Sequence, residues 1–139
     1  MRKRGRTGRA APEPVWIDES DALAIHDRLI ALHGGLPTVR DSGLLESALA
    51  RPQQHYTYKK RTSLPDLAAI HVAGIVGNHP FVDGNKRTGF VIGVLFLELN
   101  SFEFLAQEED AAQAVMELAA GSIGEAEFAR WLKTNIKRT

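Results

Sequence analysis

The sequence predicts an all-α fold built as one domain. Six segments place apolar residues at helical spacing, and capping residues, glycines or prolines delimit them. Two of the six are apolar around most of their circumference, which is typical of helices at the centre of a bundle. Only Phe102-Glu103-Phe104 alternates as a short strand would. With 139 residues and 44% hydrophobic side chains, the chain can form one domain with its own core.

Charge is distributed unevenly along the chain. Residues 1–9 contain no acidic side chain and five basic ones, namely Arg2, Lys3, Arg4, Arg6 and Arg9. Removing these five from the total of 17 basic residues leaves 12 against 17 acidic residues, a net charge of −5. We therefore expect a flexible basic arm over residues 1–14 and a folded domain over residues 15–139. Because the acidic body disfavours nucleic acid, any nucleic-acid contact is expected from the arm alone.

The same composition excludes several classes of protein. Without cysteine, neither disulfides nor thiolate metal sites are available. No apolar segment of the kind found in secretory signals follows the basic arm. The longest apolar stretch, Gly89 to Leu97, is less than half of the roughly 20 residues that a membrane span needs. We expect a soluble, cytoplasmic protein with no membrane partner.

The first predicted helix runs from Asp18 to Leu32. Either Asp18 or Ser20 can act as its N-cap by accepting hydrogen bonds from the first backbone N–H groups. Its apolar residues are Leu23, Ile25, Leu29, Ile30 and Leu32. Gly34-Gly35 then ends the helix, because glycine readily takes the left-handed conformation found after a helix C-terminus.

The second predicted helix begins after Asp41, which is another candidate N-cap. Its apolar stripe is formed by Leu44, Leu45, Ala48 and Leu49. Pro52 is predicted to close it, because proline in a helix interior removes a backbone hydrogen bond and clashes with the preceding turn. The polar and aromatic segment Gln53 to Arg61 is then predicted as a loop or a short hairpin.

The third predicted helix is the more apolar of the two central ones. Ser63 caps it, and its segment Leu67 to Val76 is apolar nearly all round. It is expected to end at His79, because Pro80 disfavours the α conformation in the residue before it. A polar loop over residues 79–85 follows and leads into the fourth helix.

The fourth predicted helix, Lys86 to Leu99, is the second central one. Its Gly89 and Gly93, four residues apart, are expected to let a neighbouring helix approach closely. Two amphipathic helices complete the domain, Glu109 to Ala120 and Glu125 to Ile136. The two central helices therefore frame the polar loop between them.

The polar loop carries a base and a carboxylate. His79 can act as the base that activates a hydroxyl, and its alternative role is to cap the third helix. Asp83 is the only carboxylate in the loop. It can hold Mg²⁺, which is often bound by one or two carboxylates together with substrate phosphates. Its alternative role is that of a turn or cap residue.

The residues that follow Asp83 predict a phosphate site. Gly84 permits positive φ, and Asn85 is expected to cap the fourth helix. Backbone N–H groups from about Gly84 to Arg87 would then point at one anion on a positive helix end. Lys86 and Arg87 lie in a turn where cations oppose the helix dipole, a conflict that a bound anion relieves. Alternatively, both side chains point to solvent or pair with acids elsewhere.

The loop motif is similar to a known family signature. His79-Pro80-Phe81-x-Asp83-Gly84-Asn85-Lys86-Arg87 resembles HPFx(D/E)GN(G/K)R, the signature of the Fic/Doc superfamily. Gly34-Gly35-Leu36-Pro37 and Arg40-Asp41-x-Gly43-Leu44-Leu45-Glu46-Ser47-Ala48-Leu49 resemble the opening of death-on-curing (Doc) proteins. The resemblance covers roughly Val15 to Asn135. It implies the Fic fold, a helical bundle with the motif loop between two central buried helices.

The resemblance also implies an activity, the transfer of part of a nucleotide, here ATP, to a protein hydroxyl. By motif position, His79 is the catalytic base and Asp83 binds Mg²⁺. The residues implied to contact or leave room for the phosphates are Gly84, Asn85, Lys86 and Arg87. Gln53 to Arg61 falls where family members carry a flap that docks the target, which makes Lys59, Lys60 and Arg61 candidate docking residues.

Two departures from the family's adenylyltransferases resemble Doc. Lys86 stands where those enzymes usually have glycine, and Phe90 stands where they usually have a second arginine. A lysine in the pocket changes how the triphosphate lies, which favours the kinase reaction of Doc, phosphoryl transfer from ATP to translation elongation factor Tu. Gly84 points the other way, because adenylyltransferases share it. AMP transfer to a protein remains one alternative, and a weakly catalytic nucleotide- or partner-binding module remains another.

The resemblance implies partners as well. Self-inhibited relatives carry an (S/T)xxxE(G/N) helix within their own chain. The segment Ser42 to Ser47 comes close but ends in serine, and it lies in the Doc-like second helix. We therefore expect no internal inhibitor, a separate antitoxin protein, and a translation factor as the protein target of a toxin–antitoxin system.

Overall fold

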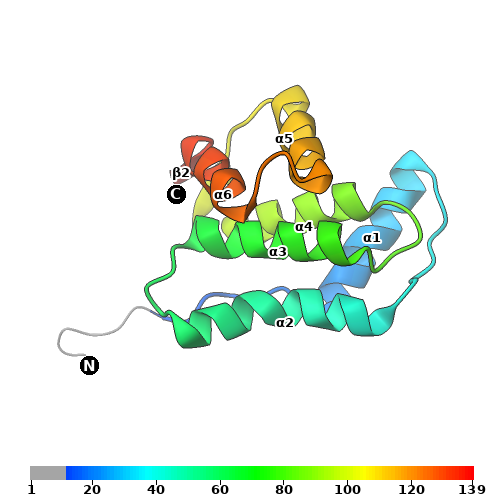
Figure 1. The fold of residues 1–139 in the computed structure, drawn as a ribbon, viewed down its shortest axis with the longest axis horizontal. Coiled ribbons are helices and arrows are strands. Elements are labelled where there is room, and N and C mark those ends of the chain that lie inside the picture. The colour runs from blue at the N-terminus through cyan, green and yellow to red at the C-terminus, as the bar shows by residue number, and fades with distance from the viewer. Residues whose placement is uncertain (1–11) are drawn as a thin grey trace.

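The computed structural model describes residues 12–139 and confirms the all-α architecture (Figure 1). Within that range the helices are α1 Glu19–His33, α2 Ser42–Tyr58, α3 Leu64–Asn78, α4 Asn85–Leu99, α5 Glu108–Ala120 and α6 Glu125–Thr134. Two short strands, β1 Phe102–Phe104 and β2 Ile136–Arg138, pair antiparallel. No helix in the described part of the chain is both long and apolar enough to cross a membrane. The five basic residues of the predicted arm lie outside the described residues, so the arm stays a prediction.

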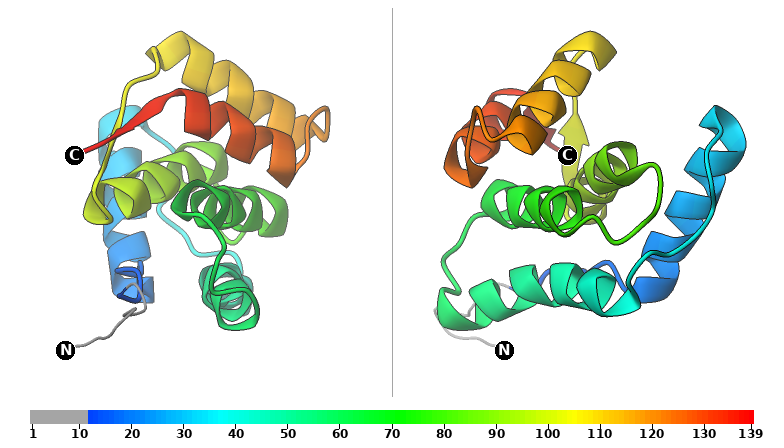
Figure 2. Two further views of the ribbon diagram at one scale, coloured as in Figure 1. Left: turned by 90° about the vertical axis from the view of Figure 1, so that its left-hand side faces the viewer. Right: turned by 45° about the vertical axis from the view of Figure 1, so that its right-hand side comes forward.

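The helices are arranged around a central pair. In Figures 1 and 2, α3 and α4 lie between α2 on one side and α5 and α6 on the other, while α1 crosses beside α4. The largest fully buried apolar side chains come from every layer: Phe81, Phe96, Phe128, Ile17, Leu45, Leu67, Ile75, Ile92, Leu97 and Leu132. Because this core surrounds α3 and α4, it fixes both ends of the loop that joins them.

The central helices approach closely at two glycines of α4, as predicted. A Cβ at Gly89 would lie 3.2 Å from side-chain atoms of Ile75 and Val76. A Cβ at Gly93 would overlap the Val72 side chain of α3. Since neither helix can shift without disturbing these contacts, α3 and α4 form a tightly packed pair.

The predicted helix starts are confirmed for the first three helices. Asp18 accepts a hydrogen bond from the Asp21 N–H in a capping box, and α1 ends at Gly34 with φ 87°. Asp41 caps α2 through the Leu44 N–H, and Ser63 caps α3. These signals are local, which is why the sequence alone predicts them.

The prediction that Pro52 closes the second helix is wrong. α2 continues through this buried proline to Tyr58, so Gln53–Tyr58 is helical rather than a loop or hairpin. Beyond the proline, Tyr56 packs edge-on against Trp16 with the ring centroids 5.7 Å apart. Such tertiary packing outweighs the one backbone hydrogen bond that proline removes.

The C-terminal end also differs from the prediction. α6 stops at Thr134, and Asn135 is its C-cap rather than a helical residue. Ile136 begins β2, whose register places it opposite Phe104 of β1. The short strand predicted at 102–104 is therefore confirmed, whereas Ile136, predicted as the last residue of the helix, is the first residue of its partner strand.

Candidate active site

The motif loop opens onto a cleft of about 990 Å³ between α4, α5 and the end of α1. All six motif residues with a predicted role contribute to its lining, namely His79, Asp83, Gly84, Asn85, Lys86 and Arg87. Leu29 and His33 of α1 and Val115 and Met116 of α5 form parts of the walls. The structure thus brings the predicted base, carboxylate and cations together in one cavity large enough for a small molecule.

His79 ends α3, as predicted, in a left-handed conformation. Its φ is 55° and its ψ is 54°, uncommon for a residue other than glycine. Arg40 holds this turn, because its Nε donates to the His79 carbonyl at 2.7 Å and its Nη2 donates to the Asn78 carbonyl at 2.9 Å. The imidazole is exposed and lines the cleft, where a bound hydroxyl could reach it; its role as the base stays a prediction.

Asp83 presents one carboxylate oxygen to the cleft. Its Oδ2 accepts a hydrogen bond of 2.8 Å from the Leu36 backbone N–H, while Oδ1 has no such partner within the described range. The residues there contain no group of three or more His, Cys, Asp or Glu side chains that could hold a metal on its own. One exposed carboxylate beside the predicted phosphate site fits Mg²⁺, which completes its shell with phosphate and water oxygens. That role of Asp83 stays a prediction.

Asn85 is not the N-cap of the fourth helix, contrary to the prediction. Gly84 occupies that position with φ 81°, and Asn85 is the first helical residue. The Asn85 side chain is buried and closes the loop, because Oδ1 accepts from the Phe81 N–H at 3.0 Å and Nδ2 donates to the Phe81 carbonyl at 2.8 Å. Its predicted contact with phosphate therefore depends mainly on its backbone N–H, which lies in the first turn of α4.

The glycine at position 84 is required by its surroundings in the loop. A Cβ there would lie 3.3 Å from Ile30 Cδ1 and 3.7 Å from the His26 ring, both on α1. Any side chain would also be strained by the positive φ. The expectation that this glycine leaves room for phosphates stays a prediction.

Lys86 and Arg87 stand in the first turn of α4 without acidic neighbours. That turn contains no Asp or Glu, and no side chain caps it. The ion pairs found between described residues are Arg51–Glu125 and Lys133–Asp66, so neither motif cation has a carboxylate partner there. An uncapped helix N-terminus with two unpaired cations would favour a bound anion, as predicted for this turn.

The predicted docking residues Lys59, Lys60 and Arg61 lie away from this cleft. They form the exposed turn between α2 and α3, whereas the motif loop follows the opposite end of α3 (Figure 1). α3 has 15 residues and so spans about 22 Å. Because α2 continues as a helix to Tyr58, the exposed turn that could dock a target is shorter than predicted, and the docking role of the three residues stays a prediction.

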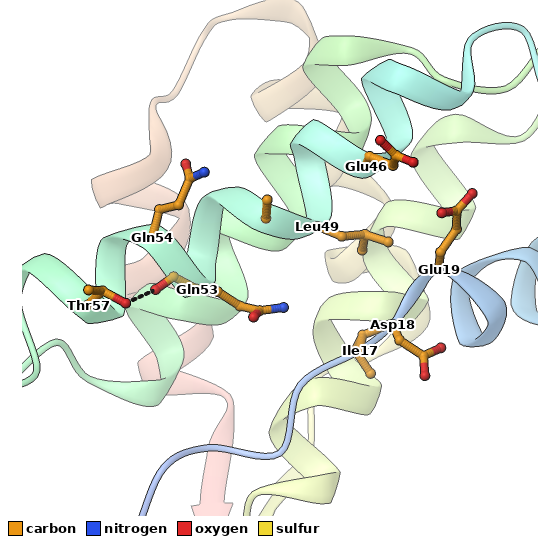
Figure 3. Close-up of a pocket in the computed structure, with 9 residues that line it drawn as sticks. Ile17, Asp18, Glu19, Glu46, Leu49, Gln53, Gln54 and Thr57 are labelled. Atoms are coloured by element: carbon orange, nitrogen blue, oxygen red, sulfur yellow. Dashed lines mark hydrogen bonds between the residues drawn. The ribbon is translucent and has the colours of Figure 1, made fainter.

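A second, smaller hollow lies between α2 and the start of α1 (Figure 3). Its volume is about 400 Å³, and its wall includes Ile17 and Leu49 together with the acidic residues Asp18, Glu19 and Glu46. Glu46, the glutamate of the segment that resembles an inhibitory helix, therefore borders this hollow. It does not line the cleft that holds His79.

Sequence reasoning missed two side chains that hold the loop. Arg40 is one of them, and His26 of α1 is the other. His26 is buried, its Nε2 lies 2.8 Å from the Asp83 carbonyl oxygen, and its ring stacks on Phe81. The sequence did carry a signal for His26. It lies four residues after Ala22, and therefore on the same face of the helix, among apolar residues that indicate a buried position.

The sequence is similar to a known family and to proteins within it. The family model described as "Fic/DOC family" matches residues 16–97, which include the entire motif loop. The "Protein kinase doc" of Escherichia phage P1 is 31% identical over 117 residues, which cover 84% of this chain and 92% of that protein. The "Toxin Doc" of Mycolicibacterium smegmatis is 38% identical over 103 residues, which cover 73% of this chain and 77% of that protein.

Proposed function

Because the chain belongs to the Fic/DOC family, we propose that it is a Doc-like toxin of a toxin–antitoxin system and that it transfers a phosphoryl group from ATP to a protein hydroxyl. The observation that carries this proposal is the start of α4. Its uncapped N–H groups and the unpaired Lys86 and Arg87 line the same cleft as His79 and Asp83. Such a site suits phosphoryl transfer, in which catalysis consists largely of positioning and charge neutralisation.

The residues of the cleft divide the reaction between them. His79 accepts the proton of the target hydroxyl while the hydroxyl oxygen forms a bond to the γ-phosphorus of ATP. The bond from that phosphorus to the β–γ bridging oxygen breaks, and ADP leaves with the electron pair. Lys86, Arg87 and the N–H groups of α4 offset the negative charge on the phosphate oxygens. Mg²⁺ on Asp83 would neutralise further phosphate charge when bound.

Isotopic labelling tests which part of ATP is transferred. Purified protein is incubated with bacterial lysate, Mg²⁺ and ATP labelled at either the γ or the α phosphate, with the His79→Ala variant as the matched control. We expect label from the γ position only and none with the variant. Label from the α position would replace phosphoryl transfer with AMP transfer. No label from either position would favour a module that binds nucleotide or partner with little catalysis.

The target and the antitoxin are also part of the proposal. Expression of the protein should arrest growth, and His79→Ala should abolish the arrest because it removes the base. Elongation factor Tu, the target implied by the resemblance to Doc, should become labelled as a purified substrate. Growth arrest that persists in the His79→Ala variant would contradict the catalytic basis of toxicity. Co-expression with neighbouring genes would identify a separate protein that relieves the arrest.

A further inference from the structure

His26 contacts the motif loop through both an edge and a face of its ring. The side chain is 1% exposed, and its Nε2 lies 2.8 Å from the Asp83 carbonyl oxygen. Because a carbonyl oxygen can only accept, Nε2 carries the hydrogen and donates it. The ring also stacks flat on Phe81, with centroids 3.7 Å apart and planes 8° apart. One residue of α1 therefore holds two positions of the loop.

The hydrogen bond from His26 determines the direction of a backbone donor. In a planar trans peptide, the C=O of one residue and the N–H of the next point in opposite directions. Since the Asp83 carbonyl points at α1, the Gly84 N–H points away from it. That N–H donates no hydrogen bond among residues 12–139, and Gly84 lines the cleft. His26 thus leaves the Gly84 N–H available beside the uncapped N–H groups of α4.

Other contacts in the described part of the chain hold the residues on either side of the Asp83–Gly84 peptide, but none of them holds the peptide itself. The Leu36 N–H donates to the Asp83 carboxylate, and Gly84 lies close to α1, where a Cβ would be 3.3 Å from Ile30 Cδ1. Thr38 accepts the Val82 N–H at 2.9 Å on the other side of the loop. With its neighbours held in this way, the orientation of the Asp83–Gly84 peptide depends on the one remaining bond, the donation from His26.

We propose that His26 is a positioning residue for phosphate binding. It acts through the Asp83–Gly84 peptide, which it orients so that the Gly84 N–H and the Asp83 carboxylate both serve a Mg²⁺–nucleotide in the cleft. This inference rests on the proposed function, because it assigns the phosphates of the nucleotide to that cleft. A residue that only filled space would depend on its ring shape, whereas this role depends on its N–H.

Two variants separate the N–H from the ring. His26→Phe keeps an aromatic ring to stack on Phe81 but removes the donor, whereas His26→Gln keeps an N–H donor and removes the ring. The matched control is His71→Phe, which changes the other fully buried histidine in the described range, one that bonds to Leu67 within α3. Melting temperatures identify any variant that fails to fold.

Two measurements on the full-length protein test the proposal. Calorimetric titration gives the affinity for Mg²⁺–ATP, and amide hydrogen exchange reports the order of peptides that cover residues 80–87. We expect His26→Phe to weaken binding about threefold to tenfold, the range that one hydrogen bond supplies, and to raise exchange in these peptides. His26→Gln should recover part of both losses, and His71→Phe should change neither.

Specific outcomes overturn the inference. Affinity and exchange in His26→Phe equal to those of the unmodified protein would show that the N–H orients nothing of consequence. Equal impairment of His26→Phe and His26→Gln would assign the role to packing on Phe81. If the unmodified protein does not bind Mg²⁺–ATP, the proposed function fails. Unchanged exchange in His26→Phe would on its own contradict the claim that His26 positions the loop, whatever the result for binding.

Discussion

His71 should make the protein lose stability in mildly acidic solution. Its ring lies in the core, 4.5 Å from the Phe96 ring, and its Nδ1 donates to the Leu67 carbonyl at 2.8 Å. Nε2 is buried and has no hydrogen-bond partner in the described part of the chain. Burial lowers the pKa of His71 from 6.5 to about 4, because the charged ring would lose its water without gaining a partner.

The lowered pKa makes the free energy of unfolding depend on pH. Below pH 6.5 the unfolded chain binds a proton at His71 that the folded protein refuses until about pH 4. The free energy of unfolding therefore decreases as pH falls through this window. The stability that the neutral, buried His71 ring contributes is fully present only above pH 6.5. Each pKa unit corresponds to about 1.4 kcal/mol, so the free energy of unfolding falls by about 3 kcal/mol across the whole window and by about 2 kcal/mol by pH 5. That is a large part of the roughly 5–15 kcal/mol that stabilises a typical domain.

Urea denaturation at several pH values between 7 and 5 measures this contribution. The comparison is with His71→Phe, which keeps an aromatic ring in the core and removes the titrating group. The other four histidines are common to both proteins, so the difference between the two curves reports His71. The unmodified protein should lose about 2 kcal/mol more than the variant over this range. Parallel curves would refute the reasoning, and His71→Gln replaces the variant if phenylalanine does not fit.

Three further substitutions test the packing and the loop. Gly93→Ala should lower the free energy of unfolding by about 1–3 kcal/mol, because its Cβ would overlap Val72; an unchanged melting temperature would contradict the tight pairing of α3 and α4. Arg40→Gln should raise amide exchange around His79 and lower the free energy of unfolding by about 1 kcal/mol, because it removes or weakens two hydrogen bonds to carbonyls at the end of α3. Exchange equal to that of the unmodified protein would show that His79 keeps its conformation without them. Thr88→Val should stabilise the protein by about 1 kcal/mol, because the Thr88 hydroxyl is buried without a partner; a loss of stability on urea denaturation would reveal a bond that the structure does not show.

The parts of the fold predicted from sequence are those specified by neighbouring residues. Ser63 caps α3 and Pro80 follows its end, so both limits of that helix are set within a few positions. The close packing at Gly89 and Gly93 could be predicted as well, because two small residues one turn apart form a groove for a partner helix. The motif residues were predicted to share a site for the same reason, since they lie within one loop and one helical turn.

The parts that the sequence did not predict depend on residues distant in the chain. Pro52 has the local character of a helix end, but packing between Tyr56 and Trp16, 40 positions apart, carries α2 beyond it. Ile136 continues the apolar pattern of α6, and only pairing with Phe104 makes it a strand. The segment Gln53 to Arg61 was predicted to be a loop or hairpin for the same reason, but its first six residues belong to α2 and only the turn at 59–61 follows the helix.

The motif residues face in two directions, so the signature does not predict that every one of its side chains reaches a ligand in the cleft. Phe81 and the side chain of Asn85 face inward, where the amide completes a pair of hydrogen bonds across the loop. The side chains of Lys86 and Arg87 are exposed and contribute to the cleft. Inward residues are required for the shape of the loop and can be shared by relatives that catalyse different reactions. Under the proposed function, the choice between phosphoryl and AMP transfer would then depend on the outward positions, of which Lys86 is one.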